Sequence, residues 1–459
     1  MTRIDRSRLP DVGADPRFVF PSIVRHTLGN GLHVCTVEHH NVPIITLNLQ
    51  VAGGSGADPE GLEGLAALVA DMADEGTGTL SALEVSDALS RIGAAYDVDV
   101  GGDATDFSLT TLTRFASRGA ALLADMATRP RLLESEFLRV RQLRLDRLRQ
   151  LKDLPSAVAE QTFLRLVYGN HPYAHLAIGS DASLRRLTSD EIVSFHAGAF
   201  QPSKSMLIVC GAMTHEEMRR LAEDTFGGWV ATHRSPNGAR AASDIEPVAG
   251  PVTKLVVVPR ESAAQSELRI GHLSTRRVTP DYSAQLVMNA VLGGQFVSRV
   301  NLKLREEKAY TYGARTSFDW RRGMSPFVLQ TSVHTASTAD AIADSLAEIS
   351  GLRGTRPPTD EEMSLAKASL TRGYPRGFET AQQVARSVSM LGLYGLPDTY
   401  FEEFVPKVNA VTSRDVVDAA ARYLDPAKLT TLVVGDYSAI AETLRGLNLG
   451  EPQMRAAEF

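Results

Sequence analysis

An internal repeat limits the folds open to this chain more than any other feature of its sequence. Residues of the first half recur, in the same order, about 220 residues later. The recurring residues are Phe107, Leu109, Thr111, Ala116 and Ser117 against Phe327, Leu329, Thr331, Ala336 and Ser337, Tyr168 and Gly169 against Tyr394 and Gly395, and Thr188, Ser189, Pro202, Lys204, Val209 and Gly211 against Thr412, Ser413, Pro426, Lys428, Val433 and Gly435. One match would be chance, but an ordered series with a slowly drifting offset indicates an internal duplication.

The repeat divides the chain into two halves that are each expected to fold as a domain. The 459 residues suffice for several domains of ordinary size. The segment 235–251 is rich in Pro, Gly, Ala and Ser, and is the predicted linker. It separates a predicted N-terminal peptidase-like domain, 1–234, from a predicted C-terminal one, 252–459.

Hydrophobic periodicity predicts an α+β fold for each half. The stretch 44–51 alternates apolar and polar residues as a strand does, and 105–112 is also strand-like. Residues 62–73 and 80–91 have the composition and spacing of helices, with Ser81 as the expected N-cap of the second. We therefore predict two homologous α/β sandwich halves, each an antiparallel sheet with helices on one face.

Composition and charge exclude several classes of function. The net charge of −6 gives no basic field that would attract nucleic acid. The sequence has no run of about 18 apolar residues, so no membrane span is expected. Its N-terminal segment lacks the apolar stretch of a signal peptide, which predicts a cytoplasmic protein; a periplasmic location stays open if a leader has been removed. Cys35 and Cys210 are too few for a disulfide framework.

The segment 64–77, with the sequence GLAALVADMADEGT, is the most informative motif of the first half. It resembles the insulinase/pitrilysin-type metallopeptidase family, the inverzincins, which include proteins like the mitochondrial processing peptidase. Family members carry two zinc-binding His and a catalytic Glu in the order H-x-x-E-H. The residues that match the frame of this motif are Gly64, Ala66, Met72, Gly76 and Thr77. Ala67 and Asp71 stand at the two His positions, and Ala70 stands at the Glu position.

These substitutions remove the chemistry of the motif. Alanine has no lone pair for zinc and no proton to transfer, and a single Asp does not make a tetrahedral site. The resemblance places the third zinc ligand, a Glu on a later helix, at Asp146 or Arg147, and neither is Glu. We therefore expect no metal, no cofactor and no catalytic residue in this chain alone. Taken by itself, 64–77 is an ordinary amphipathic helix.

The predicted helix 139–152 is unusually rich in arginine. Its arginines are Arg139, Arg141, Arg144, Arg147 and Arg149. With an acidic net charge overall, a solvated or interface face is the favoured interpretation over a nucleic-acid site.

The histidines do not predict a zinc site either. His171 and His175 belong to a His-Pro-Tyr loop that resembles the family, and the proline between them disfavours the helix that a metal-binding pair would need. His215 has no second His one helical turn on. His39 and His40 are interpreted as a strand-end pair without a carboxylate nearby in the sequence.

The second half carries an element with different chemistry. Residues 289–313 resemble the family segment L-G-G…S-R-L…L-R-E followed by Tyr, and Arg305 and Tyr312 match its Arg/Tyr pair. An Arg offers a planar fork to a peptide carbonyl or carboxylate, and a Tyr hydroxyl can donate to an oxyanion. We expect Arg305 at a helix end and Tyr312 in a strand. The alternative is a surface salt bridge of Arg305 with Glu306 or Asp319 beside a core tyrosine.

The resemblance covers about residues 18–440 and fails only at the metal site. It implies a non-catalytic, substrate-orienting subunit of a heterodimeric zinc metalloendopeptidase, which encloses peptides or unfolded segments in a cavity. Zinc would be held by a homologous partner subunit. The alternative is a purely structural or assembly subunit, which resembles the respiratory-complex core proteins, although a scaffold would not need an Arg/Tyr pair. A stand-alone hydrolase with a rewired site is the least supported, because no His and carboxylate cluster compensates for the lost ligands.

Overall fold

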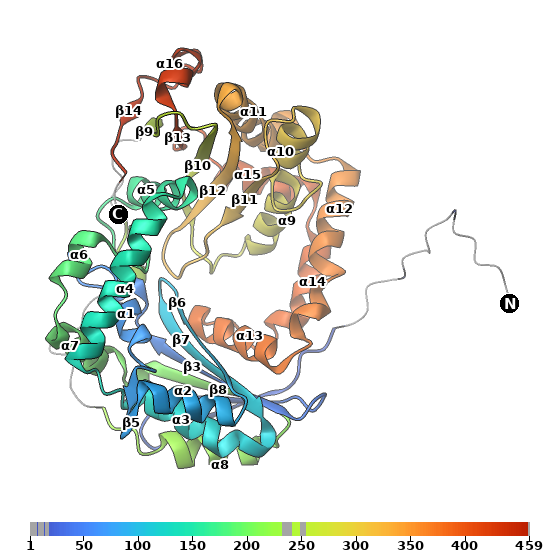
Figure 1. Ribbon diagram of the computed structural model, residues 1–459. Helices are drawn as coiled ribbons and strands as arrows, with labels where there is room; N and C mark the ends of the chain where they lie inside the picture. Colours follow the sequence, from blue (N-terminus) through green and yellow to red (C-terminus); the bar gives the residue numbers. More distant parts are fainter. Residues whose placement is uncertain (1–6, 8–12, 14–17, 232–240, 248–253, 458–459) are drawn as a thin grey trace.

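The computed structural model describes residues 7, 13, 18–231, 241–247 and 254–457, and is built around two six-stranded sheets (Figure 1). The first sheet has the order β1 (Ile23–Thr27), β2 (His33–Glu38), β8 (Ser205–Gly211), β3 (Ile44–Ala52), β7 (Ala104–Leu112) and β6 (Ala95–Val100). The second has the order β11 (Ala314–Phe318), β12 (Ser325–His334), β10 (Gln265–Thr275), β13 (Thr430–Gly435), β9 (Leu255–Pro259) and β14 (Gln453–Met454). β4 (Gly76–Thr77) and β5 (Leu80–Ser81) form a small separate pair.

Helices follow the strands in both halves. Those of the first half are α1 (Leu65–Asp71), α2 (Ala82–Arg91), α3 (Ala116–Thr128), α4 (Glu134–Lys152), α5 (Pro155–Tyr168), α6 (Asp181–Arg186), α7 (Ser189–Ala199) and α8 (His215–Phe226). Those of the second are α9 (Tyr282–Leu292), α10 (Arg299–Asn301), α11 (Thr338–Ser350), α12 (Asp360–Thr371), α13 (Ala381–Tyr394), α14 (Tyr400–Ala410), α15 (Ser413–Tyr423) and α16 (Tyr437–Arg445). Among the described residues, no helix has the length and apolar character needed to cross a membrane.

The two sheets share one strand order. The order β2–β8–β3–β7–β6 in the first corresponds to β9–β13–β10–β12–β11 in the second, and each of these units has one parallel pair among antiparallel neighbours. The repeated residues lie on equivalent strands: Leu109 of β7 pairs with Leu47 of β3, and Leu329 of β12 pairs with Ile270 of β10. The predicted duplicated α+β fold is therefore confirmed. The expectation of a purely antiparallel sheet in each half is wrong, because β2 pairs with β8 and β9 pairs with β13 in parallel.

One strand departs from the register that the repeat suggests. Val209 of β8 pairs with Leu47, whereas its sequence counterpart Val433 pairs with Leu268, two residues from Ile270. Because side chains alternate along a strand, a shift of two residues keeps every side chain on its original face. Both valines consequently remain in the apolar cores of their halves.

Each sheet is covered by helices of its own half on one face and by a helix of the opposite half on the other (Figure 1). In the first sheet, α13 from the second half packs on β3 and β8, where Val384 and Val388 share an apolar cluster with Ile208. Reciprocally, Phe163 of α5 packs with Val256 under the second sheet. Within each half, the helices of that half cover one face of the sheet, as predicted. The other face is covered by a helix from the opposite half, α13 on the first sheet and α5 on the second.

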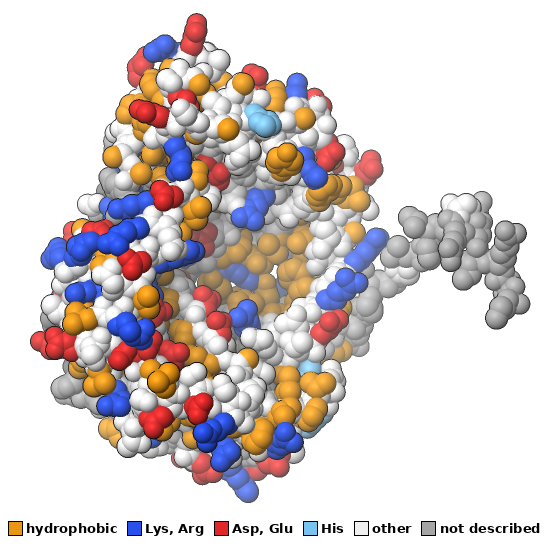
Figure 2. All heavy atoms as spheres, in the orientation of Figure 1, with side chains coloured by type: hydrophobic (Ala, Val, Ile, Leu, Met, Phe, Trp, Pro, Cys, Tyr) orange, Lys and Arg blue, Asp and Glu red, His pale blue; other side chains and the backbone are white. Residues whose placement is uncertain are grey.

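The turn between β11 and β12 joins the two halves. Within this turn, 319–324, the carbonyl of Met324 accepts a hydrogen bond from the Tyr168 hydroxyl at 2.6 Å. The backbone N–H of Arg322 donates to Asp103 Oδ2 at 2.9 Å. Asp103 lies on the equivalent turn between β6 and β7, so the halves meet through corresponding turns. Figure 2 shows that the surface of the molecule is hollowed between the two halves.

The predicted linker, 235–251, falls largely outside the described residues. The part that is described, 241–247, contains a single 3₁₀ turn, Ala242–Asp244. The domain bounds 1–234 and 252–459 remain predictions, while the two sheets use strands that lie on either side of this segment.

Candidate functional site

The degenerate motif lies on α1, a buried helix of the first half. Ala67 and Ala70 are both buried, and both line the cavity over this helix. Asp71, at the end of the helix, accepts a hydrogen bond from Arg144 Nε of α4 at 2.6 Å. An ion pair therefore stands at the position of the second motif His.

A cavity of about 720 Å³ opens over this helix. Arg147 lines it together with Ala67, Asp71 and Arg144, whereas Asp146 does not. Of the two positions predicted for the third ligand, Arg147 is thus the one that faces the motif.

The side chains around α1 do not fit a zinc ion. Zinc is bound by thiolate, imidazole and carboxylate groups in a tetrahedral arrangement. Here Ala67 and Ala70 offer methyl groups, the carboxylate of Asp71 is paired with Arg144, and a second guanidinium faces the same cavity. Within the part of the chain that the structure describes, no group of three or more His, Cys, Asp or Glu is arranged to hold a metal ion.

Asp58 and two close-packed backbones fix the start of α1. Asp58 accepts hydrogen bonds from the backbone N–H groups of Gly64 and Ala66, both at 2.7 Å. Gly64 has a φ of +98°, and a Cβ there would lie 2.9 Å from the Ile178 carbonyl oxygen. The glycine of the motif frame is therefore required by backbone packing, even though the metal chemistry is absent.

Asp58 gives the stability of the protein a pH dependence that Asp58→Asn should remove. Burial raises the pKa of the Asp58 carboxyl to about 7, although its two backbone hydrogen bonds lower it. The folded state thus keeps a proton that the unfolded state releases near its ordinary pKa. The contribution of Asp58 to the free energy of unfolding should decrease as the pH rises from about 4 to about 7. In urea unfolding across this pH range, the free energy of unfolding should decrease less in Asp58→Asn than in the wild type. The same pH dependence in both proteins would contradict the raised pKa of Asp58.

The histidines noted in the sequence make structural contacts. His171 and His175 have a ring nitrogen 3.0 and 3.1 Å from a backbone carbonyl oxygen. The interpretation that His40 lacks a nearby carboxylate is wrong, because His40 Nε2 lies 3.1 Å from Glu38 Oε2. Alternation along an extended chain puts residues two apart on one side, which explains this pair. His215 Nε2 lies 3.8 Å from the same carboxylate.

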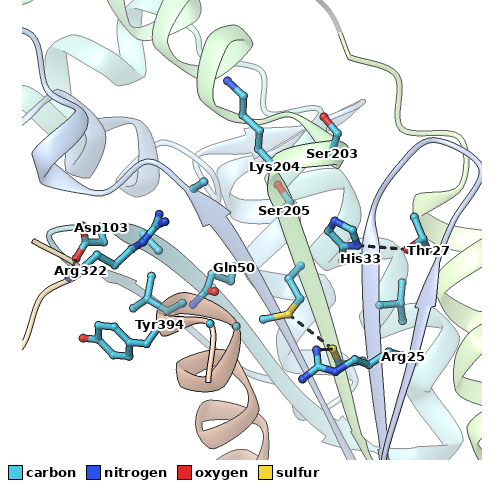
Figure 3. A pocket seen from close by; sticks show the side chains of 18 of the residues that line it. Arg25, Thr27, His33, Gln50, Asp103, Ser203, Lys204, Ser205, Arg322 and Tyr394 are labelled. Carbon is cyan, nitrogen blue, oxygen red and sulfur yellow. Dashed lines mark hydrogen bonds between the residues drawn. The ribbon is translucent and has the colours of Figure 1, made fainter. Parts of the chain in front are cut away.

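A cavity of about 820 Å³ lies on the first sheet beside the C-terminal end of α13 (Figure 3). Arg25 lines this cavity. Its Nη2 donates to Asp398 Oδ1 at 2.5 Å, and its Nη1 donates to Cys35 Sγ at 3.2 Å. His33 also lines this cavity, and its Nδ1 lies 3.3 Å from the Thr27 hydroxyl oxygen (Figure 3). None of the residues predicted to bind substrate lines this cavity.

Arg305 and Tyr312 line one cavity of about 550 Å³ in the second half. Arg305 lies in a π-helical turn, Leu302–Glu307, with its guanidinium carbon 4.5 Å from the centre of the Phe296 ring. Its Nη1 is 3.4 Å from Glu306 Oε1, so the weak ion pair of the alternative interpretation is present. Tyr312 is 88% exposed, which excludes a core tyrosine. The structure thus brings the two residues together at one open surface.

The expectation that Tyr312 lies in a strand is wrong. It lies in the loop that leads into β11, which begins at Ala314. Asn301 holds this loop: its Oδ1 accepts from the Ala314 N–H at 3.1 Å, and its Nδ2 donates to the Phe296 carbonyl at 2.7 Å. One buried amide therefore positions the segments on both sides of Arg305.

Two further arginines, Arg269 and Arg315, line the same cavity and were not singled out from the sequence. Arg269 lies among apolar residues in the strand sequence ELRIGHL. A charged side chain between two apolar neighbours, Leu268 and Ile270, is the signal that could have identified it, since such a group is buried only when it is paired or functional.

A duplicated α+β fold that keeps the frame of a zinc-peptidase motif without its ligands defines a peptidase-like protein of the inactive type. The chain belongs to the insulinase family, peptidase family M16. Residues 33–180 match the family description "Insulinase (Peptidase family M16)", and residues 186–370 match "Peptidase M16 inactive domain". The resemblance inferred from 64–77 is thereby confirmed.

Named relatives share most of the chain at low identity. An uncharacterized zinc protease of Mycobacterium leprae (strain TN) is 23% identical over 424 residues, which cover 91% of this chain and 92% of that protein. A non-peptidase homolog of Helicobacter pylori (strain ATCC 700392 / 26695) is 21% identical over 403 residues, 87% of this chain and 90% of that protein. The relatives thus carry both peptidase and non-peptidase names.

Solved structures show the same fold. A peptidase M16 inactive domain from Pseudomonas fluorescens superposes with a TM-score of 0.83 at 22% identity, covering 90% of this chain and 98% of that chain. A protease from Helicobacter pylori has a TM-score of 0.82 at 19% identity, covering 91% of this chain and 100% of that chain.

Proposed function

We propose that this chain is the non-catalytic, substrate-orienting subunit of a heterodimeric zinc metalloendopeptidase. The observation that carries the proposal is the contrast between the two halves. Arg305 and Tyr312 share an open cavity of about 550 Å³, while Ala67, Ala70 and Asp71 stand where the family motif has its two His and its Glu. A homologous subunit with intact ligands would hold the zinc and supply the activated water.

The residues of this chain would bind and orient the peptide. Arg305 can place a planar pair of N–H donors on a peptide carbonyl. Tyr312, which is 88% exposed, can reach beyond its own subunit and donate a hydrogen bond to the oxyanion that forms when water attacks an amide. The edge strand β11 directly follows Tyr312 and can accept an extended peptide as a further strand.

A structural or assembly role is the second candidate function. It is favoured by two aromatic side chains exposed in the same cavity, Phe296 at 61% and Tyr312 at 88%. Exposed apolar side chains that gather in one place are typical of a surface that binds another protein. Such a surface would serve docking whether or not the complex cleaves peptides.

Co-expression with a homologous subunit that has an intact H-x-x-E-H motif tests the proposal. We expect the two chains to purify as one complex, and the complex to cleave peptides much faster than either chain alone. A complex without added peptidase activity would favour the assembly role. Peptidase activity of this chain alone, with no partner and after chelator treatment, would contradict both.

A further inference from the structure

Three polar side chains form one row across the second sheet, in the cavity that Arg305 and Tyr312 line. Arg269 of β10 and Arg315 of β11 both pair with Gln330 of β12, the strand between them. Directly paired residues point to the same face of a sheet, and neighbouring strands are about 4.8 Å apart. Two guanidinium groups are therefore separated by a single neutral side chain.

Arg269 is a rigid part of the cavity wall. It is 4% exposed, and its Nη1 bonds Glu267 Oε1 at 2.7 Å while its Nη2 bonds the Ser156 carbonyl at 3.3 Å. Its Nε makes no hydrogen bond within the described part of the chain, although the Glu160 carboxylate lies 3.5 Å away. A buried guanidinium held in this way keeps its positive charge and its position without a ligand.

The cavity carries more positive than negative charge. Arg269, Arg305 and Arg315 line it, and Glu267 is the one acidic residue among its described lining residues. Arg315 forms no ion pair with a described carboxylate, and its Nε and Nη2 donate to the Gln330 amide oxygen. Arg269 is already paired with Glu267, and Arg305 with Glu306. An anion bound in the cavity would therefore be most favoured beside Arg315.

We infer that this cavity binds a carboxylate of the peptide substrate, which is either an acidic side chain or the C-terminal carboxylate. The inference rests on the proposed function for the presence of a peptide. A peptide that adds to the edge of β11 places alternate side chains on the face where Arg315 and Gln330 lie. Because Nε and Nη2 of Arg315 face the Gln330 oxygen, a carboxylate there would meet the Nη1–Nη2 edge of the guanidinium, where two parallel N–H···O bonds make the pairing strong and directional.

The corresponding face of the first sheet has the opposite charge. Asp99 of β6 pairs with Asp106 of β7, and Asp97 lies two residues before Asp99 on the same edge strand. Asp97 is paired with Arg386 at 3.5 Å, and Asp106 accepts hydrogen bonds from Asn48 and Ser389. The carboxylate in this row that would repel an acidic peptide is therefore Asp99. The edge strands β6 and β11 would therefore bind different peptide segments, and the segment that carries the carboxylate would bind at β11.

Binding of four labelled decapeptides to the purified full-length chain tests the inference. The peptides share one sequence and carry Glu or Gln at one internal position, each with either a free C-terminal carboxylate or a C-terminal amide. By fluorescence anisotropy at low salt, the peptide with neither carboxylate should bind at least about tenfold more weakly than the best carboxylate peptide. The two peptides with one carboxylate each identify its source. Equal affinity for all four would overturn the inference.

Substitutions at one arginine locate the site. Arg315→Gln should remove most of the carboxylate preference, and Arg315→Lys, which keeps the charge without the fork, should retain part of it. Arg91→Gln removes the same charge from exposed α2 and should leave the preference unchanged. An undiminished preference in Arg315→Gln would overturn the inference.

These measurements involve neither a partner subunit nor turnover. If the chain shows no preference for a carboxylate but the co-expressed heterodimer cleaves peptides, the inference is wrong and the proposed function stands. Absence of binding for every peptide would count against both.

Discussion

Replacing Tyr312 by Phe should lower the turnover of the proposed heterodimer by about 10²–10³-fold, the usual cost of losing one oxyanion donor. The change removes a hydroxyl and keeps the ring, so the loop held by Asn301 retains its course. A hydroxyl that donates to the oxyanion acts in the transition state and hardly at all in the ground state. The effect should therefore fall on kcat, with little change in KM, in a steady-state assay with a fluorogenic peptide.

Arg305→Ala should impair both binding and turnover, because this side chain would hold the substrate in position before the reaction. Gel filtration should show that both variants still assemble. Tyr437→Phe is a matched control, since Tyr437 begins α16 and does not line the cavity. Normal kinetics in both Arg305→Ala and Tyr312→Phe would make these residues structural and favour the assembly role.

Local elements of the fold could be predicted because their signals lie within a few residues of each other. Ser81 was expected to cap the second helix, and its side chain does accept the Glu84 N–H at the start of α2, while Glu84 bonds back to Ser81. The repeat likewise predicted the duplicated topology. Both kinds of signal depend on the order of residues along the chain, which the sequence shows directly.

The exchange of α5 and α13 between the halves could not be predicted in the same way. An apolar stripe on a helix shows that the helix packs, but it does not show against which sheet. The same limit applies to the candidate site. Arg305 and Tyr312 were identified from the resemblance of their segment to the family's Arg/Tyr element. Arg269 and Arg315 enter the cavity through the pairing of β10, β12 and β11. The register of distant strands brings these two arginines together, and no local pattern encodes it.

The family resemblance places the lost third ligand at Asp146 or Arg147, and the structure separates these two positions. Arg147 lines the cavity over α1 and Asp146 does not. Asp71 is already paired with Arg144, which is 13% exposed. Replacing Asp71 by His alone would leave this guanidinium without a partner and close to any bound cation, which opposes metal binding. A carboxylate at position 147 would both complete the ligand set and face Arg144.

Four substitutions, Ala67→His, Ala70→Glu, Asp71→His and Arg147→Glu, should therefore give a chain that retains about one zinc ion after dialysis, because three ligands from two helices then converge. The first three alone should retain far less than one, as should the wild type. The matched control combines those three with Asp146→Glu, which adds the same carboxylate one residue away from the cavity, and it should also fail. Metal analysis of the chelator-washed proteins gives the result. One tightly held zinc in the wild type would refute a metal-free first half, and equal zinc in the Arg147→Glu and Asp146→Glu versions would show that α4 does not present position 147 to the motif.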